Sequence, residues 1–137
     1  MQFPEGFVEK YEEILGDEAR DFLASFEEEA VSAFRVNPLK EAPVSFSNPI
    51  PQTPWGYYGK VSGKSPEHAT GLVYSQEPAA QMVAQVAQPS PGMKVLDLAA
   101  APGGKSTQLA AYLAGEGLLV SNEISSKRAK ILVENME

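Results

Sequence analysis

Cysteine is absent from the 137-residue sequence. The chain therefore has no disulfide, no thiolate metal site and no cysteine nucleophile. Long apolar runs are also absent: no window approaches the roughly 18 uncharged apolar residues of a membrane span, and residues 1–5 lack the basic and then apolar run of a signal peptide. We therefore expect a cytoplasmic protein with no membrane and no metal among its partners.

Basic residues are scarce, with 11 Lys and Arg against 18 Asp and Glu, and the net charge is −7. This balance argues against a nucleic-acid partner, because phosphate binding depends on Lys and Arg. The acidity is concentrated at one end, since residues 1–34 hold ten acids and two bases, residues 35–74 hold four bases and two acids, and residues 75–137 hold five bases and six acids. The overall charge therefore does not exclude RNA as a partner of the rest of the chain.

Two helices are predicted in the acidic end. Apolar residues recur at steps of three and four across residues 4–15, Gly16 is a stop signal, and Asp17 can cap a second helix with an apolar stripe that runs to Phe26. The acidic run Glu27–Glu29 falls where solvent would be. We interpret the pair as a solvated helical hairpin, with repulsion of wrong partners as the alternative.

Prolines interrupt the middle of the chain at positions 38, 43, 49, 51, 54 and 66. They exclude long helices, so residues 34–74 are predicted to form brief strands and extended connections. The aromatic residues Trp55, Tyr57 and Tyr58 could stack on bases, but aromatic side chains beside Pro and Gly more often pack in a small core.

One helix is predicted over residues 78–87. Proline suits its first turn, and Ser75 or Glu77 can satisfy the free amides there. The residues predicted to form its buried side are Met82, Val83 and Val86.

Strands and helices alternate in the last third of the chain. We predict strands over residues 94–98, an apolar run interrupted only at Asp97, and over residues 118–121, with helices over residues 106–113 and from residue 126 onward. Such crossovers require a parallel sheet covered by helices. Two strands cannot complete a buried parallel sheet, so we expect a fragment of a longer domain.

The turn after the first of these strands reads AAAPGGKS. Gly104, Lys105 and Ser106 match the second half of the phosphate-loop pattern G-x-x-x-x-G-K-[ST], but its first glycine is replaced by Ala99. Pro102 also removes one backbone N–H from a loop that would need such groups to bind phosphate. The dinucleotide pattern G-x-G-x-x-G is absent as well, so a nucleotide-binding ATPase or GTPase fragment is the weaker alternative.

A turn of small residues lets a ligand lie against the backbone at the carboxyl end of a strand, where open α/β sheets bind ligands. Glu123 follows the next strand, at a place where a carboxylate can accept both hydroxyls of a ribose. An adenosine-bearing ligand without a pyrophosphate, S-adenosylmethionine, fits this pattern, because Lys105 or the amides of the following helix could meet its carboxylate. Taken singly, the same residues could be a plain turn, a surface lysine and a helix cap. The predicted cofactor-binding residues are Ala99, Ala100, Ala101, Pro102, Gly103, Gly104, Lys105 and Glu123.

Four segments carry a family resemblance: residues 95–110 (VLDLAAAPGGKSTQLA), 121–135 (SNEISSKRAKILVEN), 34–40 (FRVNPLK) and 71–84 (GLVYSQEPAAQMVA). Together they resemble the Sun-family RNA (cytosine-5) methyltransferases, and in particular the bacterial ribosomal RNA enzymes of the RsmF kind. The resemblance implies an α/β fold, in which a truncated class I (Rossmann-like) methyltransferase parallel sheet follows a small α+β N-terminal accessory domain. The accessory domain would span residues 1–74, and residues 75–137 would begin the S-adenosylmethionine-binding domain.

The resemblance also implies methyl transfer from S-adenosylmethionine to carbon 5 of cytosine in RNA, ribosomal RNA in particular. Arg35, Asn37, Gln76 and Glu77 would lie near the cofactor or RNA cleft, or else form an ion pair that braces the accessory domain and a helix cap. Ala99 stands where many members of the family have Cys. The two catalytic cysteines of the family have no counterpart in this sequence, so we assign no catalytic residue and expect this chain alone to be inactive. A non-catalytic RNA-binding module is a further alternative.

Overall fold

The structure, a computed structural model, describes residues 2–41 and 44–137. It divides into two compact units, residues 1–30 and residues 31–137. Pro43, one of the prolines counted above, lies outside the described residues. Within these ranges no helix has the length and apolarity needed to cross a membrane.

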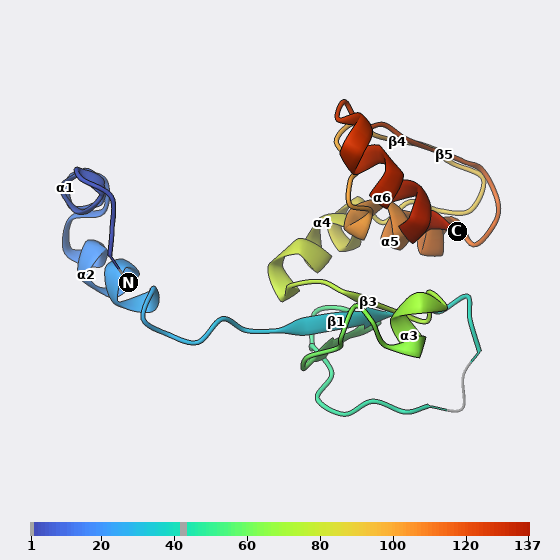
Figure 1. Cartoon of the computed structure of the whole chain (residues 1–137), viewed down its shortest axis with the longest axis horizontal. Coiled ribbons are helices and arrows are strands. Elements are labelled where there is room, and N and C mark those ends of the chain that lie inside the picture. Colours follow the sequence, from blue (N-terminus) through green and yellow to red (C-terminus); the bar gives the residue numbers. More distant parts are fainter. Residues whose placement is uncertain (1, 42–43) are drawn as a thin grey trace. The chain divides into compact units, whose positions relative to one another are not determined.

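The first unit is a pair of short helices joined by a 3-10 turn (Figure 1). Helix α1 spans Phe7–Leu15, the turn spans Gly16–Glu18, and helix α2 spans Ala19–Ser25. Both predicted helices are present, but α1 begins three residues after Pro4, whose carbonyl accepts a hydrogen bond from the amide of Phe7. The predicted cap at Asp17 is wrong, because α2 continues directly from the 3-10 turn and its first amides have no side-chain cap.

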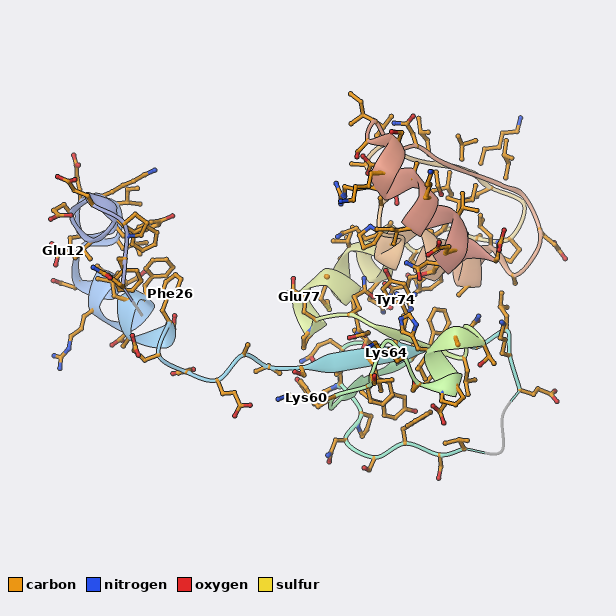
Figure 2. All side chains as sticks on the ribbon, viewed as in Figure 1. Glu12, Phe26, Lys60, Lys64, Tyr74 and Glu77 are labelled. Atoms are coloured by element: carbon orange, nitrogen blue, oxygen red, sulfur yellow. The ribbon has the colours of Figure 1, made fainter. Side chains whose placement is uncertain are left out.

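Aromatic rings hold the two helices together. The ring of Phe26 meets the rings of Phe3, Phe7 and Phe22 edge to face, with centroids 5.2–5.8 Å apart, and Tyr11 lies 4.7 Å from Phe22. Figure 2 shows Phe26 and Glu12 on opposite sides of the pair. The acidic side chains thus lie outside a small aromatic core, as amphipathic helices require.

The second unit begins with a three-stranded antiparallel sheet. Its strands are β1 (Ala33–Val36), β2 (Gly56–Tyr58) and β3 (Val73–Ser75), in the order β2-β1-β3, and the short helix α3 (Pro66–Ala69) precedes β3. Phe34 at the centre of β1 packs with Leu72, Val73 and the partly buried Phe46 and Tyr57. The brief strands predicted between the prolines are confirmed.

The aromatic residues of this segment pack against the protein. The ring of Tyr57 stacks 5.8 Å from Phe34, and the ring of Trp55 lies 4.8 Å from Tyr112. Tyr58 is the most open of the three and is 40 % exposed. The small-core interpretation therefore describes Trp55 and Tyr57 better than stacking on bases does.

A parallel two-stranded sheet with three helices forms the rest of the unit. Helix α4 (Pro78–Ala87) leads into β4 (Lys94–Asp97), then α5 (Gly104–Leu113), β5 (Leu118–Ser121) and α6 (Ser126–Met136). Strands β4 and β5 pair in parallel, with Leu96 opposite Val120. In Figure 1, α4 and α5 lie between this pair of strands and the antiparallel sheet. The predicted α/β alternation is confirmed, with element ends within two residues of those expected.

Among residues 2–41 and 44–137, helices cover one face of the parallel pair and leave the other open. Val95, Asp97, Leu119 and Ser121 face the helices and are partly buried. The opposite face starts at the exposed Lys94 and is otherwise apolar, with four large apolar side chains between 47 % and 69 % exposed. These side chains are Leu96, Leu98, Leu118 and Val120.

Helix α4 buries a different side from the one predicted. Val83 and Val86 are 53 % and 80 % exposed, whereas Gln81 and Ala84 are fully buried. The Gln81 side-chain amide nitrogen donates to the carbonyl of Gln76 at 2.9 Å, whereas its side-chain oxygen is buried without a hydrogen-bond partner in the described part of the chain, so the cost of burying this polar side chain is only partly offset. The expectation that the valines would pack inside is therefore wrong. The expected side-chain cap is absent too, since Glu77 occupies the N-cap position without a side-chain hydrogen bond.

Candidate functional site

Asp97 anchors the turn between β4 and α5 at both of its ends. One carboxylate oxygen accepts from the amide of Ala99 at 3.4 Å, and the other accepts from the hydroxyl of Ser106 at 2.8 Å. Ser106 is fully buried and also shares a hydrogen bond of 2.7 Å with Ser121 of β5. A hydroxyl has one proton to give, so Ser106 donates to Asp97 and accepts from Ser121.

The turn is also tied to the end of the neighbouring strand. The amide of Asn122 donates to the carbonyl of Asp97 at 2.8 Å, the amide of Ala100 donates to the carbonyl of Asn122 at 2.9 Å, and the Asn122 side chain donates to the carbonyl of Leu98 at 2.9 Å. These bonds extend the parallel ladder beyond β4 and β5. They bring the residue after Asn122, which is Glu123, to the turn.

The carboxylate of Glu123 lies against the turn, and its side chain is only 4 % exposed. It accepts a hydrogen bond of 2.9 Å from the amide of Ser125 and lies 3.6 Å from the guanidinium of Arg128. The amide of Ser125 is the largest cause of a lowered pKa for Glu123, and Arg128 and the amides of Ala101 and Ile124 lower it further, against an opposing effect of desolvation. Turn and carboxylate therefore meet as the sequence predicts.

Arg128 and α6 hold the far side of the turn. The Arg128 guanidinium, which faces Glu123, also donates to the carbonyl of Ala101 at 2.6 Å. The side chain of Asn135 donates to the carbonyl of Pro102 at 2.8 Å, and Leu132 packs on the buried Ala101. The turn is thus fixed by hydrogen bonds from Asn122, which follows β5, and from α6.

The lowered pKa of Glu123 predicts acid sensitivity. A carboxyl with a pKa below its ordinary value of 4.5 stabilises the fold above that pH and loses this contribution as the pH falls through the lowered value. The difference in melting temperature between wild type and Glu123→Gln should therefore be constant near neutral pH and shrink below about pH 4.5. Thermal denaturation across pH measures it, with Glu134→Gln as the control. A difference that does not change with pH would contradict the prediction.

A shallow hollow of about 180 Å³ lies beside the turn, on the side of β3 and α4. Figure 2 shows Tyr74 and Glu77 where the antiparallel sheet meets the helices. Six of the eight predicted cofactor residues line this hollow, while Gly103 and Glu123 do not. The lining residues are Tyr74, Ser75, Gln76, Glu77, Ala80, Ala99, Ala100, Ala101, Pro102, Gly104 and Lys105.

The two glycines of the turn have different roles. Gly103 has φ +119°, which side-chain-bearing residues rarely adopt, and a Cβ there would face Leu132 and Asn135 of α6 at 3.4 Å. A Cβ on Gly104 would instead point at the side chains of Gln76, at 3.0 Å, and Tyr74, at 3.3 Å, which line the hollow. Gly103 therefore shapes the backbone, and Gly104 keeps the hollow open.

The residues expected near the cofactor or RNA cleft, Arg35, Asn37, Gln76 and Glu77, lie at different places in the structure. Arg35 and Gln76 are buried and hydrogen-bonded to each other, next to the turn, and Glu77 lines the hollow. Arg35 forms no ion pair within residues 2–41 and 44–137, so the ion-pair interpretation is wrong; its partners are neutral groups. Asn37 braces a surface turn, where its side chain accepts from Leu39 and donates to Gly71.

Sequence reasoning did not identify three side chains that shape the turn. Asp97 and Ser106 clamp its two ends, and Arg128 links it to Glu123. A lone acid within an apolar strand was a usable signal for Asp97, because a buried carboxylate needs hydrogen-bond donors nearby. No local pattern distinguishes Arg128 from the neighbouring lysines.

This combination of a parallel strand pair, a small-residue turn and a carboxylate after the second strand is typical of the opening part of the Rossmann-like fold found in class I methyltransferases. Residues 3–78 match the family described as the N-terminal domain of 16S rRNA methyltransferase RsmF, and residues 84–137 match 16S rRNA methyltransferase RsmB/F. The chain belongs to the RsmF family, and the resemblance expected from the sequence is confirmed.

Proteins similar in sequence match this chain over nearly its whole length. It is 35 % identical to ribosomal RNA small subunit methyltransferase F of Vibrio campbellii over 100 % of this chain and 33 % of the relative, and 32 % identical to tRNA (cytosine(49)-C(5))-methyltransferase of Pyrococcus abyssi over 94 % and 45 %. A solved methyltransferase homologue from Pyrococcus horikoshii superposes with a TM-score of 0.80 at 27 % identity, over 98 % of this chain and 48 % of that one. The chain thus spans between a third and a half of these relatives.

Proposed function

We propose that this chain is the N-terminal part of an S-adenosylmethionine-dependent RNA methyltransferase that acts on carbon 5 of cytosine, and that it supplies the cofactor turn. The observation that carries the proposal is the meeting of the small-residue turn with Glu123 at the carboxyl ends of two adjacent parallel strands. That edge is where open α/β sheets bind adenosine-bearing ligands. Membership of a methyltransferase family supports the same cofactor.

The residues present fit part of this cofactor. Gly104 leaves room that a Cβ would fill, and the amino end of α5 with Lys105 offers positive charge to a carboxylate. Glu123 touches the turn at Ala101, and the Arg128 guanidinium interacts both with Glu123 and with the carbonyl of Ala101. In this proposal the Glu123 carboxylate would accept the ribose hydroxyls. At about 180 Å³ the hollow is smaller than the roughly 300–1,000 Å³ of a typical small-molecule site. In this proposal the rest of the site comes from other parts of a longer protein.

Bound cofactor would supply an electrophilic methyl group, and the chain would hold and orient it. Carbon 5 of cytosine is a poor nucleophile until a thiolate has added to carbon 6, and this sequence has no cysteine. The attacking thiolate would therefore lie elsewhere in the complete protein. We expect the chain alone to bind cofactor weakly and to transfer no methyl group.

Ribosomal RNA is the proposed substrate, because both matching families are named as 16S rRNA methyltransferases. The relative that acts on tRNA makes tRNA the first alternative to test. Two further expectations belong to this proposal: a cytoplasmic location, and a functional boundary near residue 74 between the accessory and cofactor-binding domains.

The geometry disfavours the phosphate-loop alternative. A phosphate loop needs free amides that point at the ligand. Here the amides of Ala99 and Ala100 donate to Asp97 and Asn122, the amide of Ala101 acts on Glu123, and Pro102 has none. Four consecutive positions of the turn thus offer no free donor to phosphate.

Ligand-dependent stabilisation tests the proposed function. S-adenosylmethionine at about a hundredfold its dissociation constant should stabilise the complete protein by about 2.7 kcal/mol, seen as a rise in melting temperature, whereas ATP with magnesium should not. Glu123→Ala should weaken S-adenosylmethionine binding by about tenfold, since it removes both ribose acceptors. Stabilisation by ATP alone, or unchanged cofactor affinity in Glu123→Ala, would contradict the proposal.

A further inference from the structure

Arg35 of β1 crosses from the antiparallel sheet to the amino end of α5. We propose that Arg35 is a positioning residue that fixes the first turn of α5 against β3 and so sets the shape of the ligand hollow, without touching the ligand. This inference rests on the proposed function, because the hollow is taken to hold part of S-adenosylmethionine.

The guanidinium of Arg35 joins three elements. One of its nitrogens donates to the side chain of Gln76, to the carbonyl of Gly104 at 2.8 Å and, more weakly, to the side chain of Gln108 at 3.4 Å. The other donates to the hydroxyl of Thr107 at 2.6 Å. The planar fork of an arginine suits such divergent acceptors, whereas a lysine ammonium could satisfy only some of them.

This arrangement breaks two general rules. Arg35 is 4 % exposed and has no carboxylate partner in the described part of the chain, although buried charges are normally paired. Burial lowers the pKa of Arg35 to about 10, so it stays charged at neutral pH. Its charge also faces the first turn of α5, the end of a helix that disfavours cations. Such departures concentrate at functional sites, since stability alone does not favour them.

The partners of Arg35 are the residues that decide how the hollow is shaped. Gln76 and Gly104 both line it, and the ring of Tyr74, which also lines it, lies 5.5 Å from the guanidinium. A Cβ at residue 104 would lie only 3.0 Å from the Gln76 side chain, so the spacing between these elements is tight. Arg35 bonds both sides of that gap and holds it at a fixed width. Arg35 itself is not among the lining residues.

Arg35→Lys tests this role, with Phe34→Leu as the matched control. Phe34 is the preceding residue of β1, is equally buried, and packs in the core of the antiparallel sheet, so its variant destabilises the same sheet without touching the turn. In the complete protein we expect Arg35→Lys to weaken S-adenosylmethionine binding about tenfold by calorimetry, and to speed hydrogen exchange across residues 103–108. Phe34→Leu should lower the melting temperature with little change in either readout.

A second pair of variants keeps the test decisive if Arg35→Lys does not fold. Thr107→Val removes one acceptor of Arg35, so it should weaken S-adenosylmethionine binding and speed hydrogen exchange, each by less than Arg35→Lys does. Thr107→Ser keeps the hydroxyl and should show the affinity and exchange of the wild type. Equal losses of S-adenosylmethionine affinity in Arg35→Lys and Phe34→Leu would overturn the inference while leaving the proposed function intact. Unchanged affinity in both Arg35→Lys and Thr107→Val would do the same. A wild-type protein that does not bind S-adenosylmethionine would overturn the proposed function first.

Discussion

Replacing Gly104 with valine is expected to weaken binding of S-adenosylmethionine by about tenfold to a hundredfold while the protein stays folded. The first atom of the new side chain would lie 3.0 Å from Gln76 and 3.3 Å from Tyr74, so the branched remainder must enter the hollow between them. Overpacking of a filled site costs about 1–3 kcal/mol, which corresponds to this loss of affinity. Titration calorimetry on the complete protein measures the change.

Two variants make this result specific. Gly63→Val introduces the same side chain where no atom lies within 4 Å, so it should change neither affinity nor stability. Gly103→Ala should act mainly on the fold, because its φ of +119° strains any residue with a Cβ by roughly 1–3 kcal/mol and its Cβ would face α6. If Gly104→Val bound the cofactor normally and Gly103→Ala did not, the two roles would have to be exchanged.

The elements of the cofactor-binding half could be predicted from sequence because strong local signals bound them. Pro78 opens α4, Gly103 precedes α5 and Gly117 precedes β5, and each lies where backbone chemistry demands it. The position of Glu123 followed from the parallel pairing, since the ends of adjacent parallel strands meet at one edge. The parallel pairing therefore brings two local sequence patterns, the turn and the acid, to one edge of the sheet.

What could not be predicted depends on which polar groups find partners in three dimensions. The apolar pattern of α4 indicated Met82, Val83 and Val86 as its buried side. Gln81 and Ala84 are the fully buried residues instead: Ala84 is small, and the Gln81 side-chain nitrogen donates to a backbone carbonyl while its oxygen has no partner in the described part of the chain. For Arg35 the sequence left two roles open, a place near the cofactor or RNA cleft and an ion pair, and the structure gives it neutral hydrogen-bond partners next to the turn. Its actual partners come from residues some forty to seventy positions away.

The apolar outer face of β4 and β5 is a second case in which pattern and packing differ. Parallel strands normally read as continuous apolar runs because helices cover both faces. Here Leu96 and Val120, which are paired neighbours, remain 59 % and 47 % exposed. In the described part of the chain, these two strands thus have the apolar sequence of a sheet covered on both faces, but helices cover only one face.

Replacing Gly117 with alanine is expected to cost roughly 3 kcal/mol or more of folding free energy, the largest single effect on stability that we predict. Gly117 has φ +111°, and a Cβ there would lie 2.3 Å from the carbonyl oxygen of Met93. That carbonyl accepts the amide of Leu118 at 3.0 Å, the bond that starts the pairing of β4 with β5. Relieving the collision would therefore pull the strands apart where their register is set, and move Glu123 away from the turn.

Gly115→Ala is the matched control, two residues earlier in the same loop. Gly115 also has a left-handed backbone, with φ +80°, but nothing lies within 4 Å of the position a Cβ would take. It should cost only the backbone strain, about 1 kcal/mol, so that chemical denaturation separates the two variants by about 2 kcal/mol or more. Equal losses would show that strain alone accounts for Gly117. A larger loss at Gly117, accompanied by weaker cofactor binding, would show that the close approach of β4 and β5 is what brings the turn and the carboxylate together.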